Sequence, residues 1–575
     1  MWKALLAATL SAAVIAAPAS PSRDEAAFLT IPSSSGASAT SRVLDSVYHY
    51  PGTPGDYRMA VYMRDRLRSF GLRAWLEPFA ATVYTPRALQ LQILSSPAVS
   101  FDLRDMPMPS DPDGNRGGIG LPFNAGSGSG DVRAPLVDVG KGTDADYARL
   151  ARSGVTVGGR IVLIRYGAEY RGDLAARAQV HGAAGVIFFS DPLHNPYALY
   201  TVQRGEVMGD DNEPLHIPTL PVTATTAQRL IANARLSNPS PIRLHVEMDA
   251  RRTTLWNTVG EISGADTGQM IVLGGHRDAW EYGVTDDGSG IATLLEVARG
   301  LGALHRGGWT PRRSIRIAGF DAEEIGELGS AAYVAAHRAE LQRGCVAYVN
   351  TDESASGPVF GAAAAGAIAP VAIRSIRDVL HIERPAVDVP AGGSDFEAFI
   401  YGIGTPILDI GYTGDFGTYH SPHDDYHYAS TVADPGFVHH RTIAQAIGVF
   451  AMRLASAPEP YRFSSYAVAL DEGMVSLTTA AAKAHVILDS RLRLAIGRFD
   501  RAAVAYDAGS RQNDFANALH AAQQLDMLAY SASGYASVAF PRVADAIASG
   551  KQSVVDARLR ETAAQLDAIA ARLST

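Results

Sequence analysis

Five side chains that could bind metal ions follow short apolar segments in the middle of the chain. In chain order they are His276, Asp286, Glu324, Asp352 and His420. Imidazole nitrogen and carboxylate oxygen are ligands that zinc takes in proteins, and paired zinc ions in hydrolases lie about 3.5–4 Å apart. Taken singly, each residue also fits a structural role, such as a buried histidine or an acid at a helix N-terminus. Together they indicate metal-assisted hydrolysis.

The segments that carry these residues alternate between strand-like and helix-like patterns. Strands are predicted at residues 271–273, 315–320, 346–350 and 407–410, and helices at 289–304 and 329–338. This alternation predicts an α/β fold with a mostly parallel sheet and helices on both faces. Sites in such sheets collect at the carboxyl ends of the strands, where His276, Glu324 and Asp352 are expected, whereas Asp286 and His420 follow loops.

The rest of the chain divides by composition into further regions. Residues 20–42 are rich in Ser, Ala and Pro and are expected to form a mobile leader. An insertion at residues 88–251 is expected to be β-rich, with a strand at 161–165, a helix near 174–181 and a strand at 185–189. The α/β domain that carries the five residues is expected at 20–87 and 252–458, and an Ala-rich helical domain at 459–575.

Bulk properties exclude several classes of protein. The 575 residues are 47% hydrophobic and 19% charged, which is the composition of a globular protein with a large core. The net charge of −9 argues against nucleic acid as the main partner. The one cysteine, Cys345, lies in an apolar run, so we interpret it as a core residue and expect no internal disulfide.

The N-terminus has the pattern of an export signal. Lys3 precedes an apolar run over residues 4–17, and Ala17-Pro18-Ala19 fits a cleavage site. We therefore expect a signal peptide at residues 1–19 and a secreted or periplasmic protein. The alternative is an uncut N-terminal anchor.

The order of the motifs resembles the co-catalytic zinc peptidases of family M28, in particular the subfamily of glutamate carboxypeptidase II and the transferrin receptor. The resemblance rests on His276-Arg277-Asp278, Asp286, Asp321-Ala322-Glu323-Glu324, Asn350-Thr351-Asp352 and Tyr419-His420-Ser421. It implies an inserted protease-associated domain, a C-terminal helical dimerisation domain and therefore a homodimer. A monomer with a helical lid is the alternative.

The resemblance also implies a role for each residue. His276 and Asp352 would bind one zinc, Glu324 and His420 the other, and Asp286 would bridge them. The general base would be Glu323. Asp278 would fix the ring of His276, and Tyr419 would donate a hydrogen bond to the oxyanion. The Asp286–Asp287 peptide bond is expected to be cis.

The residues of the family's substrate pocket are matched less completely in this sequence than the metal ligands are. Arg171, with Tyr419 and Tyr535, would hold a free α-carboxylate of a peptide, and Gly393 and Ser394 lie on a segment that lines the pocket. The cations that favour glutamate in the family fall here on Gly534, Asp409 and Gly411.

These departures predict a peptidase that is not glutamate-specific. The acids of the family's structural calcium site fall on Ala332 and Ala335, which argues against that ion. The expected activity is an exopeptidase of the carboxypeptidase or dipeptidase kind that uses two zinc ions. The alternatives are an aminopeptidase of the same family and a non-catalytic, receptor-like binding protein.

Overall fold

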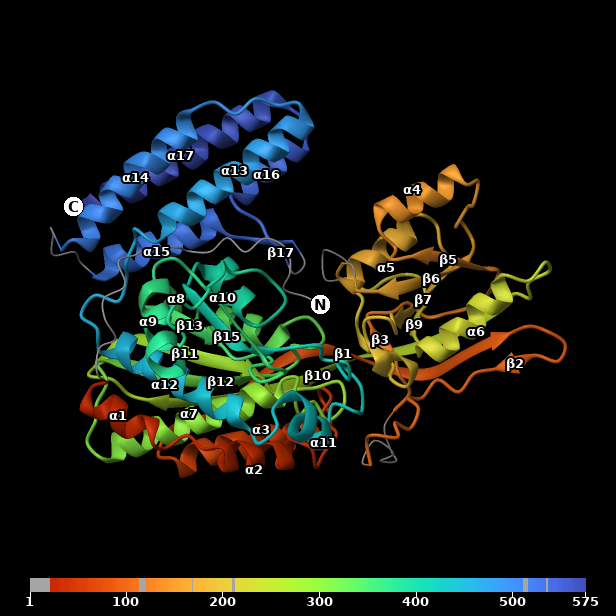
Figure 1. Cartoon of the computed structure of the whole chain (residues 1–575), viewed down its shortest axis with the longest axis horizontal. Helices are drawn as coiled ribbons and strands as arrows, with labels where there is room; N and C mark the ends of the chain where they lie inside the picture. The colour runs from red at the N-terminus through yellow and green to blue at the C-terminus, as the bar shows by residue number, and fades with distance from the viewer. Residues whose placement is uncertain are drawn as a thin grey trace.

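A computed structural model describes residues 21–112, 120–167, 169–208, 213–509, 515–533 and 536–574. The expected signal segment, residues 1–19, lies outside the described residues. Figure 1 shows three parts: a central sheet between layers of helices, an inserted domain beside it, and a bundle of helices that projects from the central part. Among the described residues, no helix is both long and apolar enough to cross a membrane.

The central sheet confirms the predicted α/β fold. Its middle consists of four mutually parallel strands in the order β15, β13, β11 and β12. Their bounds are Ile407–Thr413, Cys345–Asn350, Asp266–His276 and Arg313–Phe320. Every residue of β12 and β13 is buried, as is typical of parallel strands covered on both faces. Cys345 is buried in β13 as predicted.

Antiparallel strands flank this parallel core. They are β14 (Val359–Ala364) on one side and β10 (Ile242–Ile262), β1 (Arg73–Ile93), β2 (Val99–Ser100) and β4 (Gly130–Ala134) on the other. Strands β1 and β10 pair along nearly their whole length and run from the central sheet into the inserted domain (Figure 1).

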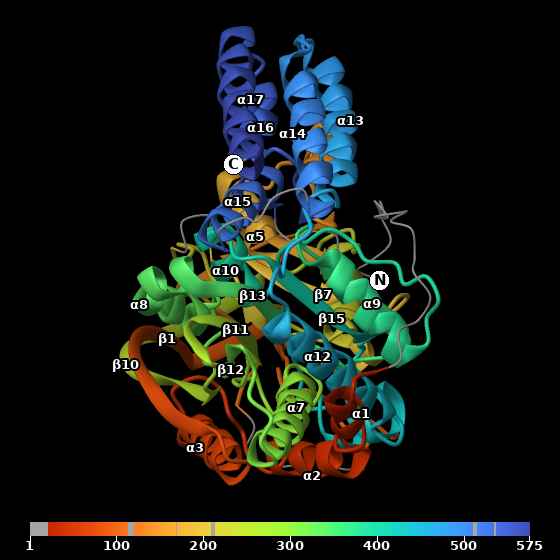
Figure 2. The same ribbon diagram turned by 90° about the vertical axis from the view of Figure 1, so that its left-hand side faces the viewer.

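Helices cover both faces of the sheet. Helices α3 (Pro54–Ser69), α7 (Gly288–Arg306) and α12 (Val438–Ser456) lie on one face, and α8 (Leu328–Gly344) and α10 (Phe396–Ile403) lie on the other, as Figure 2 shows. Helix α9 (Ala369–Leu380) packs on α12. A short helix α11 (Tyr426–Tyr428) and a π-helical turn (Ala429–Ala433) precede α12.

The prediction of a mobile leader is wrong for the described part of residues 20–42. Two helices form there, α1 (Arg23–Leu29) and α2 (Ser34–Leu44), each with a serine side chain capping its N-terminus. The fully buried Phe28 of α1 fits between α7 and α12 because Gly300 and Gly448 leave room for its ring; a Cβ on either would lie 2.4 or 1.9 Å from it. The two serine caps and the buried Phe28 stabilise these helices, although the segment has only a weak hydrophobic pattern.

The inserted domain contains more helix than the predicted β-rich unit. Its sheet has four parallel strands, β5 (Leu136–Gly140), β6 (Ile161–Tyr166), β7 (Gly185–Ser190) and β9 (Thr219–Pro221). The helices are α4 (Asp144–Arg152), α5 (Arg171–Val180), α6 (Ala224–Ala234) and a 3-10 turn at Pro196–Leu199. A short pair joins β3 (Asn124–Ala125) to β8 (Gly205–Glu206).

The C-terminal region is helical, as expected from its alanine content. It comprises α13 (Tyr466–Ala484), α14 (Arg491–Asp507), α15 (Phe515–Ala529), α16 (Pro541–Ala548) and α17 (Gln552–Ser574), with a two-stranded pair at Ala532–Ser533 and Ala536–Ser537. Helix α15 contacts α8 and α10 and so joins the bundle to the central domain. In Figure 2 the bundle stands above the central sheet.

Candidate metal centre

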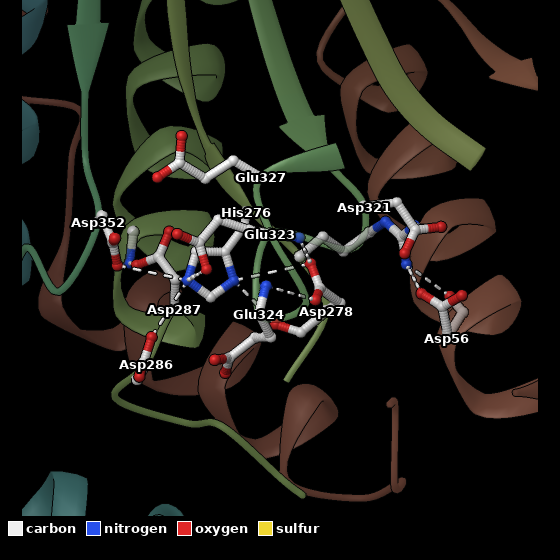
Figure 3. Close-up of polar contacts among 12 residues, drawn as sticks. Asp56, His276, Asp278, Asp286, Asp287, Asp321, Glu323, Glu324, Glu327 and Asp352 are labelled. Atoms are coloured by element: carbon white, nitrogen blue, oxygen red, sulfur yellow. Dashed lines mark hydrogen bonds and ion pairs between the residues drawn. The ribbon is translucent and has the colours of Figure 1, made fainter. Parts of the chain in front are cut away.

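The carboxyl ends of three parallel strands bring the predicted ligands to one edge of the sheet. His276 is the last residue of β11 and pairs in register with Phe320, the last residue of β12. Asp352 follows the end of β13, whose Asn350 pairs with Gly274. Glu324 stands four residues beyond β12. Figure 3 shows these side chains converging.

Asp286 lies between the two histidines. Its Oδ1 is 3.1 Å from Nε2 of His276, and its Oδ2 is 3.0 Å from Nε2 of His420. Glu324 Oε2 is 2.9 Å from the same nitrogen of His420, and Asp352 Oδ1 is 3.4 Å from Nε2 of His276. The structure therefore gathers all five predicted ligands, with Asp286 in the position of a bridge.

The donor atoms fit metal ions. Two overlapping groups could hold a cation, one of His276, Asp286 and Glu324 and the other of His276, Asp287 and Asp352. Buried atoms without a hydrogen-bond partner among the described residues include Oδ2 of Asp286, Oε1 of Glu324, Oδ1 of Asp352 and Nε2 of His420. Buried polar atoms are normally satisfied, so their grouping here is what a bound cation requires.

Both histidine rings are oriented through Nδ1 by a backbone carbonyl. His276 Nδ1 lies 2.9 Å from the carbonyl oxygen of Asp278, and His420 Nδ1 lies 3.1 Å from that of Arg204. When Nδ1 carries the proton and donates it to the carbonyl, Nε2 keeps a lone pair for a metal.

The carboxylate of Asp278 acts differently from the expected orientation of the His276 ring. It lies 3.8 Å from the ring and instead accepts hydrogen bonds from the backbone N–H groups of Glu323 (3.1 Å) and Glu324 (3.3 Å). Asp278 thus uses its carbonyl to orient His276 and its carboxylate to position the two glutamates.

The electrostatics of the centre reflect buried, crowded carboxylates. Burial raises the pKa of Glu323 well above its ordinary value and that of Glu324 to about 7. Burial acts in the same direction on Asp286, but the close contacts with His276 and His420 on either side hold its pKa below the ordinary value. When ionised, the carboxylates of Asp286, Glu323, Glu324 and Asp352 outnumber the two imidazoles, and bound cations would offset their negative charge.

Glu323 stands beside the ligands with its side chain 13% exposed and Oε2 3.8 Å from Nε2 of His276. The preceding Ala322 adopts a left-handed backbone conformation, with φ of 60°. Tyr419 stacks its ring on that of His420, with centroids 3.6 Å apart. Both residues therefore lie beside histidines of the candidate ligand set, and their predicted roles remain predictions.

The expected cis bond is present between Asp286 and Asp287. The Asp287 carboxylate caps α7: its Oδ1 accepts from Gly290 N at 2.8 Å and from Glu353 N at 3.1 Å.

Two positioning residues escaped the sequence analysis. Asp424 accepts hydrogen bonds from the backbone N–H groups of Thr285 (2.9 Å) and Asp286 (3.0 Å), so it holds the backbone of the bridging aspartate. Arg204, in the inserted domain, is 1% exposed and pairs with Asp105 at 2.8 Å and Glu281 at 2.7 Å. Proximity to His420 in sequence could have drawn attention to Asp424, whereas Arg204 is 216 residues from His420 and gives no local signal.

The predicted pocket residues are only partly brought to the centre. Arg171 is 4% exposed at the start of α5, where its guanidinium lies 4.4 Å from the ring centroid of Tyr166 and against Gly205. Ser394 accepts a hydrogen bond from Asn350 Nδ2 at 3.1 Å, next to the end of β13, and Gly393 N donates to Glu397 at 2.5 Å. Tyr535 lies outside the described residues, as does Gly534.

The positions assigned to the calcium site, Ala332 and Ala335, lie on α8. Their methyl side chains offer no oxygen ligand. The expectation that calcium is not bound there remains a prediction.

Comparison with known families gives two matches within the chain. Residues 257–437 match the model of Peptidase family M28, and residues 132–230 match the PA domain. The first match covers the five candidate ligands and Glu323, and the second covers the sheet of the inserted domain.

Two curated relatives are less than 30% identical to the chain over the residues that align. A probable glutamate carboxypeptidase VP8 of Zea mays is 29% identical over 78% of this chain and 70% of its own length. The aminopeptidase NAALADL1 of Rattus norvegicus is 27% identical over 67% of this chain and 65% of its own.

Solved structures agree on the fold. A peptidase M28 precursor from Shewanella amazonensis has a TM-score of 0.59 at 20% identity, covering 76% of this chain and 97% of that one. BSAP, a zinc aminopeptidase from Bacillus subtilis, has a TM-score of 0.53 at 18% identity, covering 74% and 96%.

Proposed function

We propose that the chain, whose residues 257–437 match the model of Peptidase family M28, is an exopeptidase that uses two zinc ions to hydrolyse small peptides. The observation that carries the proposal is the position of Asp286, whose two oxygens face the two histidines at 3.1 and 3.0 Å. A carboxylate placed in this way can serve two ions at once. The set of five ligands also argues against a non-catalytic, receptor-like role.

The residues divide between two ions. His276 and Asp352 would hold one zinc, Glu324 and His420 would hold the other, and Asp286 would bridge them. When bound, the ions supply Lewis acidity and lower the pKa of water at the centre.

The chain's own groups would move and hold the protons. Glu323, fixed through its backbone by Asp278, is placed to take a proton from the attacking water and to deliver it to the leaving amine. Its raised pKa, caused first by burial, suits a group that must carry that proton between the two steps. Tyr419, stacked on His420, would donate its phenol proton in a hydrogen bond to the oxyanion.

Arg171 supports the carboxypeptidase or dipeptidase reading. Its buried guanidinium lies in the inserted domain next to Glu206, whose environment includes the charges of Glu324 and His420. A guanidinium fork binds a carboxylate through two parallel hydrogen bonds, so a peptide with a free C-terminus is the expected substrate. An aminopeptidase is the second candidate, supported by the relative named aminopeptidase NAALADL1.

Metal analysis and one variant test the proposal. The purified protein should contain close to two zinc ions per chain, and Glu323→Ala should keep them while losing roughly 10²–10⁴-fold of its peptide hydrolysis. The exposed Glu247→Ala is the control and should keep both zinc and activity. Well under two zinc ions per chain, or full activity in Glu323→Ala, would contradict the proposal.

Peptides with blocked ends distinguish the two candidates. Hydrolysis that requires a free C-terminal carboxylate and tolerates an acetylated N-terminus supports the role of Arg171. The opposite pattern supports an aminopeptidase.

We also propose that the protein is exported and forms a homodimer through its C-terminal helices. Exposed apolar side chains on or beside these helices support the dimer; they are Val475, Ile487, Leu494, Val504 and Met527. Light scattering that gave a monomeric mass, or recovery of the protein in the cytoplasm, would contradict these two proposals.

A further inference from the structure

Two residues of the metal-binding motifs, Arg277 and Asp321, lie outside the proposed ligand set. Arg277 follows the ligand His276 at the end of β11, and Asp321 follows β12, two residues before Glu323. In Figure 3 the carboxylate of Asp321 lies beside that of Asp56, which belongs to α3. Each strand end therefore carries an ionisable side chain next to a residue that serves the metal centre.

The guanidinium of Arg277 bridges two carboxylates in the interior of the protein. Its Nη2 lies 2.8 Å from Oδ2 of Asp321, and its Nη1 donates to Oδ1 of Asp56. The same nitrogens donate to backbone carbonyls at 2.7 Å, Nη1 to that of Asp56 and Nη2 to that of Trp256. All three ionisable side chains are 0–1% exposed. The fork of an arginine suits such a bridge, whereas a lysine ammonium is a single compact charge.

The contacts of Asp321 hold both ends of the loop that carries Glu323. Oδ2 of Asp321 accepts from Trp256 N at 2.8 Å, and Asp321 N donates to the side chain of Asn257 at 3.1 Å. Nδ2 of Asn257 donates to the carbonyl of Gly329, in the first turn of α8, at 2.8 Å. The loop between β12 and α8 is therefore fixed to strand β10 at its beginning and at its end.

The backbone around Arg277 joins the same loop to β11. Arg277 N donates to the carbonyl of Phe320, the last residue of β12, at 2.8 Å. The next residue, Asp278, accepts from the backbone N–H groups of Glu323 and Glu324 at 3.1 and 3.3 Å. A shift of the Arg277 side chain would therefore reach Glu323 along two routes, through the bridged carboxylates and through Asp278.

The place of this network indicates a role in geometry rather than in stability alone. Removing ionised groups from water costs several kcal/mol each, so a buried ion pair stabilises a fold little compared with apolar side chains of similar volume. The network here joins α3, β10 and the ends of β11 and β12, and the last two carry His276 and Glu323. Fixing those two strand ends against each other is what the bridge accomplishes.

We propose that Arg277 is a positioning residue for Glu323: together with Asp56 and Asp321, it holds the loop of the general base against the end of β11. The inference rests on the proposed function, in which Glu323 moves the proton between the attacking water and the leaving amine. A base must lie within hydrogen-bond reach of that water, and a displacement of about 1 Å can cost about 10²-fold in rate.

The first test replaces the fork and keeps a positive charge. In Arg277→Lys a single ammonium cannot serve the acceptors of both Asp56 and Asp321. We expect kcat per zinc-loaded chain to fall about 10–100-fold, with KM and zinc content close to those of the unaltered enzyme. The assay uses whichever dipeptide, with free or blocked ends, the unaltered enzyme hydrolyses fastest. Counting only zinc-loaded chains removes the loss that unfolding alone would cause.

A pair of variants at Asp321 provides a rescue. Asp321→Ala should reduce kcat per zinc-loaded chain in the same way. Asp321→Asn should recover most of that loss, because Oδ2 accepts both hydrogen bonds and one amide oxygen can replace it. The matched control is Arg316→Lys: Arg316, on the same strand β12, bridges Glu261 at 2.8 Å and Glu340 at 2.6 Å, and its replacement should leave kcat unchanged.

An unchanged kcat per zinc-loaded chain in Arg277→Lys, or an equal fall in Arg316→Lys, would overturn the inference. Loss of zinc with kcat per bound zinc unchanged would also overturn it, because the effect would then lie on His276. If Arg277→Lys does not fold, the pair at Asp321 decides, and equal kcat values for Asp321→Ala and Asp321→Asn would contradict the role. Failure of the unaltered enzyme to hydrolyse any of the peptides would instead refute the proposed function.

Discussion

The two halves of the metal centre are built in different ways. His276 is the last residue of a central strand, and a carbonyl two residues further along the chain orients its ring. His420 lies on a loop, has a φ of 57°, and is oriented by the carbonyl of Arg204 in the inserted domain. The first half is a local consequence of the sheet, whereas the second depends on how the PA domain docks.

Asp286 joins the two halves, so its removal should have the largest effect. Asp286→Ala should lose both of the proposed zinc ions and peptide hydrolysis together, because each ion would lose the shared carboxylate. Elemental analysis and a peptidase assay measure the outcome. Retention of one tightly bound zinc would show that one half forms without the bridge.

The variant Arg204→Met should affect the His420 half of the metal centre and leave the His276 half intact. The variant leaves the buried carboxylates of Asp105 and Glu281 without their cation, which should cost about 3–5 kcal/mol of unfolding free energy. Distortion of the Arg204 backbone should weaken the zinc at His420 by about 10–100-fold while the zinc at His276 stays bound. Chelator titration followed by metal analysis would resolve the two ions.

The matched control for that variant is Arg243→Met. Arg243, near the start of β10, also pairs with an aspartate, but its pair with Asp131 is partly exposed to solvent. It should change the unfolding free energy by about 1 kcal/mol or less and leave both zinc affinities unchanged. Equal effects of the two variants would remove the special role of Arg204.

The variant Asp278→Asn tests whether the Asp278 carboxylate positions Glu323 and Glu324 in the His276 half of the centre. An asparagine side chain has one acceptor oxygen, so it can serve only one of the N–H groups of Glu323 and Glu324. We expect about a 10–100-fold lower kcat with zinc content unchanged, since the carbonyl that orients His276 remains. Loss of zinc with kcat per bound zinc unchanged would place the effect on His276 instead.

The smallest expected effect is on the pH dependence of stability near the His420 half of the centre. Burial lowers the pKa of His423, but its hydrogen bond to Asp111 outweighs burial, and the pKa lies above the ordinary value. A raised pKa stabilises the fold below the unfolded-state pKa of about 6.5, and this contribution is lost as pH rises through the folded-state value. Asp111→Asn should therefore reduce the melting temperature more at pH 5.5 than at pH 8.5. An equal reduction at both pH values would show that the His423–Asp111 pair does not titrate in this way.

The same contrast explains which parts of the molecule could be predicted. Fully apolar strand segments such as residues 345–350 predict buried parallel strands, and parallel strands end at one edge of the sheet. His276, Glu324 and Asp352 could therefore be placed near one another from strand positions alone. The cis bond at Asp286–Asp287 followed from the family resemblance.

The sequence by itself determined the sheet, the order of the ligands and the chemistry that they support, because strand ends are encoded by local patterns of burial. Only the tertiary structure placed Arg204 behind His420, Asp424 behind Asp286, and Phe28 between two helices. These contacts join residues that are distant in the chain, and they depend on how separately folded layers and domains pack, for which neither residue spacing nor hydrophobic periodicity carries a signal.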